Sequence, residues 1–320
     1  MSAFESAARR VTLRELRLLV AVARAGSILK AASEIGLTQP AVSKAIADLE
    51  STFGVQLFDR TNRGVSVTPQ GEILLRRATG VFDELRQAVD ELQSLADADR
   101  GDLRLGGTSA LCAGLLPHAI GAVRDRRPGY RFQVTELESG KLASEVAARS
   151  VDLGIGREHP AASADLAFEP LFDDRLFIVA GAQHPLAKKH SVKLRDTIHH
   201  AWALPAPDGA VTAQLQAQFR LLGLSPPDPA VTTMSMLVRY ELVATHTFLT
   251  VTYGSILRFG KLPASLRVLP IDLPSGIPIG LVRLRNRTLA PSAEVFMQVL
   301  RDLVRPMQSL RARHLLKESP

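Results

Sequence analysis

The chain has 320 residues, of which 46% are hydrophobic, and a formal net charge of +7 at pH 7. This length is too great for one typical hydrophobic core and suits a small domain joined to a larger one. The sequence contains no run near the roughly 18 apolar residues of a membrane span, no apolar signal-peptide core at its start, and a single cysteine, Cys112. We therefore expect a cytoplasmic protein with no membrane partner and no intramolecular disulfide framework.

The basic charge by itself is weak support for nucleic-acid binding. Residues 1–80 hold eleven Lys and Arg against seven Asp and Glu, and much of the remaining excess lies near the carboxy terminus. We interpret those carboxy-terminal arginines as a solvated helix or tail, because net charge affects solubility and non-specific attraction before it defines a site.

Three short helical patterns follow one another between residues 13 and 53. In the first, apolar residues recur every three or four positions from residue 13 to residue 23, and Gly26 ends the run. Ser27 can cap the second helix, and Thr38 can cap the third. A basic segment at residues 60–64 then suggests a hairpin, so the order of elements predicts a winged helix-turn-helix.

The outer face of the third predicted helix carries polar and small side chains. An α-helix fits the major groove of B-DNA, where Gln can pair with adenine and Ser can contact a base or a phosphate. Gln39 and Ser43 are therefore the candidates for reading bases, while Lys44, Arg60 and Arg63 are candidates for phosphate contacts. The complete set of candidate DNA-binding residues is Ser27, Thr38, Gln39, Pro40, Ala41, Ser43, Lys44, Arg60 and Arg63.

Several segments carry a resemblance to a known family. They are TQPAVS at residues 38–43, LE at 49–50, GVQLFDR at 54–60 and VTPQG at 67–71. Through about the first seventy residues, the sequence resembles the amino-terminal signature of LysR-type transcriptional regulators. The resemblance implies a homodimer or homotetramer on double-stranded DNA, a carboxy-terminal domain shaped like a periplasmic solute-binding protein, and a small-molecule effector in the cleft of that domain.

A long helix is predicted after the hairpin, with Thr68 as its N-cap and Pro69 as its first residue. Its apolar residues form a narrow heptad pattern, which is more easily buried against a partner helix than in a broad core. We therefore predict dimerisation through this helix and a partly palindromic operator; an ordinary amphipathic helix packed on its own chain is the alternative. The pattern consists of Leu75, Ala78, Phe82, Leu85, Val89, Leu92 and Ala96.

Beyond residue 100, short apolar runs alternate with helical patterns, which is typical of α/β units. We predict strands at residues 103–106, 130–137, 151–156, 176–180 and 281–284, and helices at residues 115–126, 141–149, 208–222 and 234–244. The expected fold class is α/β, with an amino-terminal winged helix-turn-helix, a linker helix and a bilobed effector domain that resembles periplasmic binding proteins. The expected boundaries are 11–68 for the DNA-binding domain, 69–97 for the linker helix and 101–310 for the effector domain, with lobe I at about 101–180 and 275–310 and lobe II at about 181–274.

Two loops at the predicted sheet edge are candidates for the effector site. Ligands collect at the carboxyl ends of strands in open α/β sheets, near helix N-termini whose free N–H groups favour anions. We therefore favour a carboxylated metabolite, with a neutral sugar as the alternative; helix N-capping is an alternative role for the serines and threonines. The candidate effector-binding residues are Thr108, Ser109, Ser139, Gly140, Asp208 and Thr247.

A catalytic constellation is not evident in the sequence. Ser109 is not in a G-x-S-x-G elbow, there is no Walker loop or full G-x-G-x-x-G, and His199 and His200 lack a partner with metal-ligand spacing. We expect no enzyme activity, no metal and no cofactor. An α/β enzyme and a solute-binding protein without a DNA role are the alternatives, and both leave the amino-terminal pattern without a purpose.

The mechanism that we expect is a population shift. Effector binding closes the two lobes, changes how the subunits pack, and so alters their contact with the operator or with RNA polymerase. The sequence leaves open which arrangement activates transcription.

Overall fold

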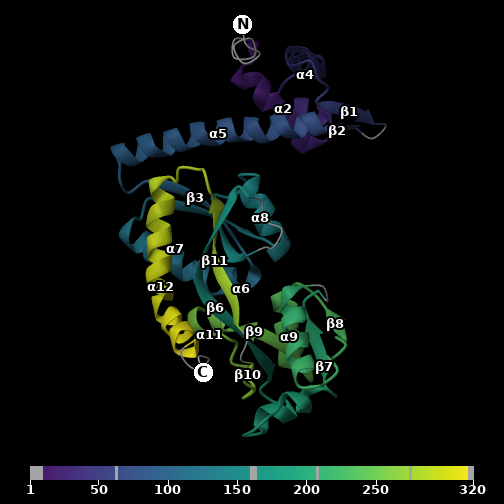
Figure 1. Ribbon diagram of the computed structural model, residues 1–320, viewed down its shortest axis with the longest axis vertical. Coiled ribbons are helices and arrows are strands. Elements are labelled where there is room, and N and C mark those ends of the chain that lie inside the picture. Colours follow the sequence, from purple (N-terminus) through teal and green to yellow (C-terminus); the bar gives the residue numbers. More distant parts are fainter. Residues whose placement is uncertain (1–9, 62–63, 159–163, 207–208, 274–275, 316–320) are drawn as a thin grey trace. The chain divides into compact units, whose positions relative to one another are not determined.

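The computed structural model describes residues 10–61, 64–158, 164–206, 209–273 and 276–315. The chain divides into two compact units, Met1–Leu92 and Gln93–Pro320 (Figure 1). Within the described residues, no helix is both long enough and apolar enough to cross a membrane.

The first unit contains the three predicted helices, α2 (Leu13–Ala25), α3 (Ile28–Glu34) and α4 (Gln39–Phe53). Their inward faces form one core, because their apolar residues recur at helical spacing. Leu19, Val22 and Val42 are completely buried in this core.

A two-stranded antiparallel hairpin follows the helices, formed by β1 (Phe58–Thr61) and β2 (Gly64–Val67). The backbone N–H of Val65 donates to the carbonyl of Gly26 at 3.0 Å, so the hairpin lies against the turn after α2. A Cβ atom on Gly64 would lie 2.3 Å from the same carbonyl oxygen, which explains why this position has no side chain.

Helix α5 (Pro69–Ala96) begins at the predicted residue. The Thr68 hydroxyl accepts from the N–H of Gly71 at 3.0 Å and donates to the carbonyl of Gln56 at 2.7 Å, so the predicted N-cap is confirmed. A Cβ atom on Gly71 would lie 2.1 Å from the carbonyl oxygen of Leu57. The start of α5 therefore lies tightly against Leu57, the residue just before β1.

The second unit is built on one sheet with the strand order β4-β3-β5-β11-β6-β9-β7-β8, and β10 also pairs with β6. Lobe I holds the parallel strands β3, β4 and β5 and the antiparallel β11. Its helices are α6, α7, α8 and α12, and α12 runs beside α7 in Figure 1. The bounds are β3 Gly101–Gly107, α6 Ser109–Ala113, α7 Leu115–Arg126, β4 Tyr130–Glu136, α8 Ser139–Ala147, β5 Leu153–Arg157, β11 Gly276–Leu284 and α12 Pro291–Leu315.

Lobe II packs around Trp202 and Phe219, whose rings meet edge to face with centroids 6.3 Å apart. Both side chains are completely buried. The bounds of its elements are η1 Pro185–Lys188, η2 Leu194–Thr197, β7 Ala201–Leu204, α9 Ala210–Leu221, β8 Val231–Thr232, α10 Met236–Thr245, β9 Phe248–Tyr253, α11 Gly254–Phe259 and β10 Leu266–Val268.

The two lobes share strand β6 (Leu166–Gly181), which is visible in Figure 1 as a long strand that runs from one lobe into the other. It pairs with β11 through Arg175 and with β9 from Leu176 onward. The strand therefore passes from lobe I into lobe II between Arg175 and Leu176, and the expected boundary near residue 180 falls inside β6. The predicted strand at residues 176–180 is only the second part of it.

Two groups of ion pairs hold lobe I together. Asp152 accepts bonds of 2.8 Å from the guanidinium groups of Arg104 and Arg287. Burial raises the pKa of Asp152, but these hydrogen bonds and charges lower it by more, so the pKa lies well below its ordinary value. Arg301 of α12 makes two parallel bonds to Glu169 of β6, at 2.7 and 2.8 Å. Both groups join segments of lobe I that lie far apart in the sequence.

Candidate functional site

A surface groove of about 430 Å³ lies in the first unit. Gln39 and Ser43 share one side of α4 there, and the Gln39 side-chain amide donates to the Ser43 hydroxyl at 3.1 Å. Gln39 is exposed and Ser43 is half-buried, so both base-reading candidates lie where another molecule can reach them. The groove is lined by Ser27, Ile28, Leu29, Gln39, Ser43, Gly64 and Val65.

Two other predicted DNA-binding residues are N-caps of helices in the first unit. Ser27 accepts from the N–H of Lys30 at 3.4 Å and caps α3 as predicted. Thr38 occupies the N-cap position of α4 as predicted, although its side chain makes no capping hydrogen bond. The exposed Thr38 hydroxyl is instead left to face solvent or a ligand.

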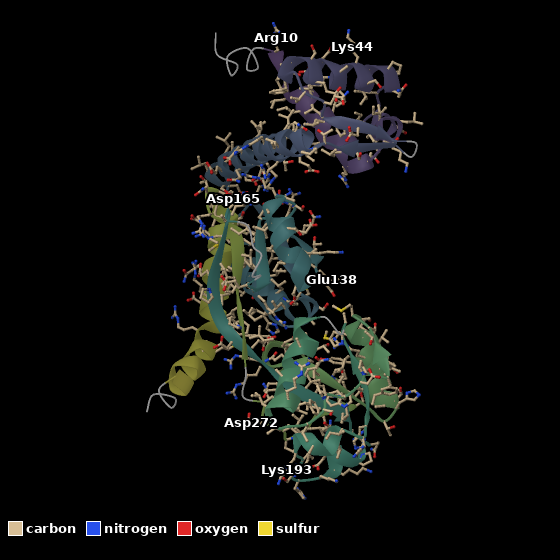
Figure 2. The ribbon with its side chains drawn as sticks, turned by 45° about the vertical axis from the view of Figure 1, so that its right-hand side comes forward. Arg10, Lys44, Glu138, Asp165, Lys193 and Asp272 are labelled. Atoms are coloured by element: carbon tan, nitrogen blue, oxygen red, sulfur yellow. The ribbon has the colours of Figure 1, made fainter. Side chains whose placement is uncertain are left out.

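Lys44 is exposed on the outer side of α4, where it is labelled in Figure 2, and Pro40 and Ala41 are exposed in the first turn of that helix. Arg60 lies in β1 opposite Val65. Its side chain, and the whole of Arg63, lie outside the part of the chain that the structure describes.

Leu29 is a lining residue of the groove that the sequence argument missed. It is 69% exposed, which is unusual for a leucine beside polar candidates. The available signal was its position two residues after the Ser27 cap.

An apolar stripe runs along α5, and we call it the α5 stripe. It differs from the predicted heptad pattern, because Ala78 packs in the core of the first unit and Phe82 lies under the guanidinium of Arg17, 5.9 Å from its ring centroid. The first part of the pattern thus serves its own domain. The exposed α5 stripe consists of Val81, Leu85, Val89, Leu92 and Leu95, which are separated by three or four positions.

The second unit contains a cavity of about 240 Å³ between its lobes. Lobe I contributes the ends of β3, β4 and β5 and the starts of α6 and α8, as the topology of an open α/β sheet requires. Glu138, at the start of α8, is labelled in Figure 2. The polar lining residues are Thr108, Ser109, Glu136, Glu138, Ser139, Arg157, Asp174, Arg239, Thr252 and Tyr253.

Of the five predicted effector residues that the structure describes, three line this cavity and two do not. Thr108 holds the N-cap position of α6 without a side-chain capping bond, and the Ser109 hydroxyl donates to the Glu136 carboxylate at the end of β4. Ser139 begins α8. Gly140 and Thr247 are not among the described lining residues, and Asp208 lies outside the described part of the chain.

Arg157 enters the cavity from the carboxyl end of β5. It donates to the Tyr253 hydroxyl, and its guanidinium lies 5.7 Å from the centroid of that ring. Burial raises the pKa of Tyr253 to about 12, so the phenol is neutral at pH 7. The Nη1 atom of Arg157 is buried and has no hydrogen-bond partner among the described residues.

Arg239 enters the cavity from α10 in the other lobe. It is only 7% exposed, and burial lowers its pKa. Its Nε atom is buried without a partner, and no ion pair or hydrogen bond of this side chain occurs within the described residues. A buried guanidinium without a counterion is costly to the fold, so this position is one where an anion would fit.

Asp174 is the buried acid of the cavity and lies on β6, just before the strand changes lobes. It is 1% exposed and accepts from the backbone N–H and the hydroxyl of Ser255, at 2.9 and 2.5 Å. Burial raises its pKa to about 6, against the lowering effects of the Ser255 hydrogen bonds and the Arg157 charge.

Sequence reasoning missed Arg157, Asp174, Arg239 and Tyr253. A signal existed for Arg157, because it directly follows the predicted third strand and so falls at the same sheet edge as the two predicted loops. A second signal was a charged Arg239 among the apolar residues of a predicted helix. Asp174 gave none, since its neighbours in the sequence do not show which lobe surrounds it.

The remaining reactive side chains do not form a site in the described residues. Groups of three or more metal-ligating side chains do not occur there. The ring of His200 packs against that of His184, with centroids 4.7 Å apart. Burial, and to a lesser extent Glu136, raises the pKa of Cys112 to about 11, so its thiol stays protonated.

Two family models match the chain. Residues 13–72 match the bacterial regulatory helix-turn-helix protein model of the lysR family, and residues 96–305 match the LysR substrate binding domain. The regulator GbpR of Azospirillum brasilense is 27% identical over 91% of this chain and 86% of its own length. The regulator TdcA of Escherichia coli (strain K12) is 30% identical over 72% of this chain and 73% of its own length.

Solved structures of this family share the fold. CbnR, a LysR family transcriptional regulator, superimposes with a TM-score of 0.67 at 18% identity, over 92% of this chain and 99% of that chain. Full-length CbnR in complex with its target DNA gives a TM-score of 0.66 at 18% identity, over 91% of this chain and 99% of that chain. With one model matching the helices and hairpin around Gln39, and the other matching the bilobed domain around the cavity, this chain belongs to the LysR family and is a DNA-binding transcriptional regulator, not an enzyme.

Proposed function

We propose that the effector of this regulator is a small organic acid, held in the cavity between Arg157 of lobe I and Arg239 of lobe II. The observation that carries the proposal is the buried guanidinium of Arg239, which lines the cavity and has no counterion among the described residues. A carboxylate placed there would supply the missing negative charge and accept hydrogen bonds from the N–H groups of the guanidinium. A neutral sugar would leave that charge uncompensated.

The helix start in lobe I supports the same chemical class. Helix α8 has nine residues, and its first residue, Ser139, lines the cavity. Its unpaired N–H groups and the positive end of its dipole favour an anion. The hydrogen-bond donors of the site are therefore Arg157, Arg239 and this helix start, and they come from both lobes.

The rest of the effector is apolar, because most of the other lining residues are. They would contact its carbon skeleton and select its shape, whereas the arginines would select its charge. The apolar lining consists of Ala110, Leu111, Leu137, Pro205, Val211, Met234, Met236, Val251, Ile256 and Ile279.

Effector binding would favour a closed arrangement of the lobes, because Arg157 and Arg239 approach one anion from opposite sides of the β6 crossing. An anion that contacts both lobes binds the closed arrangement better than the open one, and this difference in affinity is what shifts the population. The shift would change how subunits pack and how they contact the operator or RNA polymerase.

In the first unit, we propose that Gln39 and Ser43 read bases from α4, while Lys44, Arg60 and Arg63 contact phosphates. Ser27, Thr38, Pro40 and Ala41 would complete the surface that faces DNA. The exposure of Gln39 and the contact between Gln39 and Ser43 support this assignment. Replacing both residues by alanine should relax operator selectivity. Lys44→Ala should weaken binding to all sequences equally and reduce its salt dependence.

We propose that the DNA-binding domain comprises residues 11–68, the linker helix residues 69–97 and the effector domain residues 101–310. Within the effector domain, lobe I passes into lobe II after Arg175. Homodimers would form through the α5 stripe, which is too apolar and too exposed to suit an isolated helix in water. Pairing of dimers into tetramers would follow the family pattern, and a two-fold arrangement would match a partly palindromic operator. A DNA-binding regulator acts in the cytoplasm, where we place this protein.

The effector class is tested by thermal shift with organic acids and neutral sugars at equal ionic strength. A matching acid at a concentration 100 times its Kd should add about 2.7 kcal/mol of stability and raise the Tm by roughly 5–10 °C. Ser109→Ala should weaken this response and leave operator affinity nearly intact. A Tm rise with sugars and none with acids would refute the organic-acid assignment.

A further inference from the structure

We propose that an anionic effector binds to this regulator together with one proton, which Asp174 takes up from solvent. This inference rests on the proposed organic-acid effector and adds a proton as a second ligand of the same site. It makes the affinity for the effector depend on pH in the range in which cells operate.

The geometry puts Asp174 inside the effector cavity and away from water. Its carboxyl group lines the cavity, and the residue is 1% exposed. Ser255, which is completely buried, holds both carboxyl oxygens through its N–H and its hydroxyl. A second negative charge brought into this cavity would meet Asp174 with little screening.

The charged and titratable groups around Asp174 come from several elements. Arg157 of β5 and Tyr253 of β9 face it, and Arg239 of α10 lies beyond Tyr253. Glu136 and Glu138 line the cavity from lobe I but are exposed, so solvent screens their charges.

Arg157 donates to the Tyr253 hydroxyl, and its positive charge also lowers the pKa of Asp174. An effector carboxylate competes with Asp174 for this guanidinium and also repels it. Both effects favour the protonated form of Asp174 once the effector is bound. Since burial already raises the pKa of Asp174 to about 6, a modest further rise is enough for proton uptake near neutral pH.

The hydrogen bonds to Ser255 can accommodate the added proton. The proton would reside on the oxygen that now accepts the Ser255 hydroxyl, and that hydroxyl would rotate and accept instead, because a hydroxyl is both donor and acceptor. The backbone N–H of Ser255 continues to donate to the other oxygen. Uptake of one proton with one monocarboxylate therefore leaves the net charge of the cavity unchanged.

Calorimetric titration with butyrate tests the proposal, with butyramide as a neutral isostere. Between pH 8.5 and pH 6 the Kd for butyrate should tighten at least about fivefold, for a pKa that rises by one unit on binding. Titrations in two buffers of different protonation enthalpy should show almost no proton uptake at pH 8.5 and the largest uptake, of about half a proton, near pH 6.5.

Asp174→Asn is the decisive variant, since asparagine can keep both contacts with Ser255 and cannot take up the proton. It should bind butyrate with a Kd that no longer varies with pH, and without proton uptake. Asp173→Asn, on the opposite face of β6, is the matched control and should retain the pH dependence.

The outcomes separate the two proposals. Butyrate binding whose pH dependence persists in the Asp174→Asn variant overturns the proton coupling and leaves the organic-acid effector standing. Butyramide that binds as well as butyrate, or a lack of butyrate binding at any pH, overturns both.

Discussion

Replacing Arg239 by methionine should stabilise the second unit and weaken its response to the effector. Methionine keeps the length and the apolar contacts of the side chain but removes a charge that is 93% buried and has no counterion in the described residues. Replacing buried charged groups by apolar residues of similar volume stabilises proteins by up to about 4 kcal/mol. Because the cavity gives this guanidinium some access to water, we expect about 1–3 kcal/mol.

For a domain of this size, each kcal/mol shifts the Tm by roughly 2–4 °C, so the unliganded variant should melt roughly 2–12 °C higher. Effector binding should lose charge-assisted hydrogen bonds of about 1.5–3 kcal/mol in total, which is a roughly ten- to hundredfold weaker Kd. The assay is a pair of thermal melts, with and without the acid that stabilises the wild type, alongside operator binding. Operator affinity should not change.

Arg220→Met is the matched control, because Arg220 is exposed on the neighbouring helix α9 and bonds only to Gln216 within the described residues. That variant should keep both its Tm and its effector response. If Arg239→Met melted lower than the wild type and still bound the acid normally, Arg239 would be a structural residue, and the reasoning from its missing counterion would be refuted.

Three further results follow from the geometry. Gly71→Ala should unfold or severely destabilise the first unit, because its Cβ would lie 2.1 Å from the Leu57 carbonyl oxygen; a wild-type melt would contradict the close approach. Leu85→Glu with Leu92→Glu should shift the oligomer toward monomer in sedimentation experiments while circular dichroism stays unchanged, since both side chains lie in the α5 stripe; an unaltered assembly would exclude this helix as the interface. Burial, followed by the charge of His200, lowers the pKa of His184, so the unfolded state binds more protons than the folded state. The second unit should therefore lose stability as pH falls below about 6.5. If the wild type lost no more stability than the His184→Gln variant over this pH range, His184 would not be the cause.

The winged helix-turn-helix could be predicted from the sequence because its determinants are local. Apolar spacing of three and four set the buried faces of α2 and α4, and Ser27 and Thr68 supplied caps that the structure contains. Most predicted elements of lobe I were also found close to their expected positions, since the alternation of apolar runs and helical patterns is visible over short windows. Helix α7 has the predicted limits, 115–126.

Lobe II was harder to predict, because its strands are continuous apolar runs whose role depends on their neighbours. The predicted strands did not include β9, which begins at Phe248 and lies between β6 and β7 in the sheet. The first part of β6 was missed for the same reason. Its residues pair with β11, more than a hundred positions later in the chain.

The sequence by itself determined that this chain folds its first seventy residues into a DNA-reading unit, because helix periodicity, caps and turn residues act between neighbours. Only the tertiary structure decided the effector site that we propose. It brings Arg157, Asp174 and Arg239 to one cavity, although they lie on β5, β6 and α10. Burial then removes the water that would screen their charges, so a buried charge without a nearby counterion is stabilised when an anion binds beside it. Whether a charge has a counterion depends on which side chains surround it in space, and no local sequence pattern contains that information.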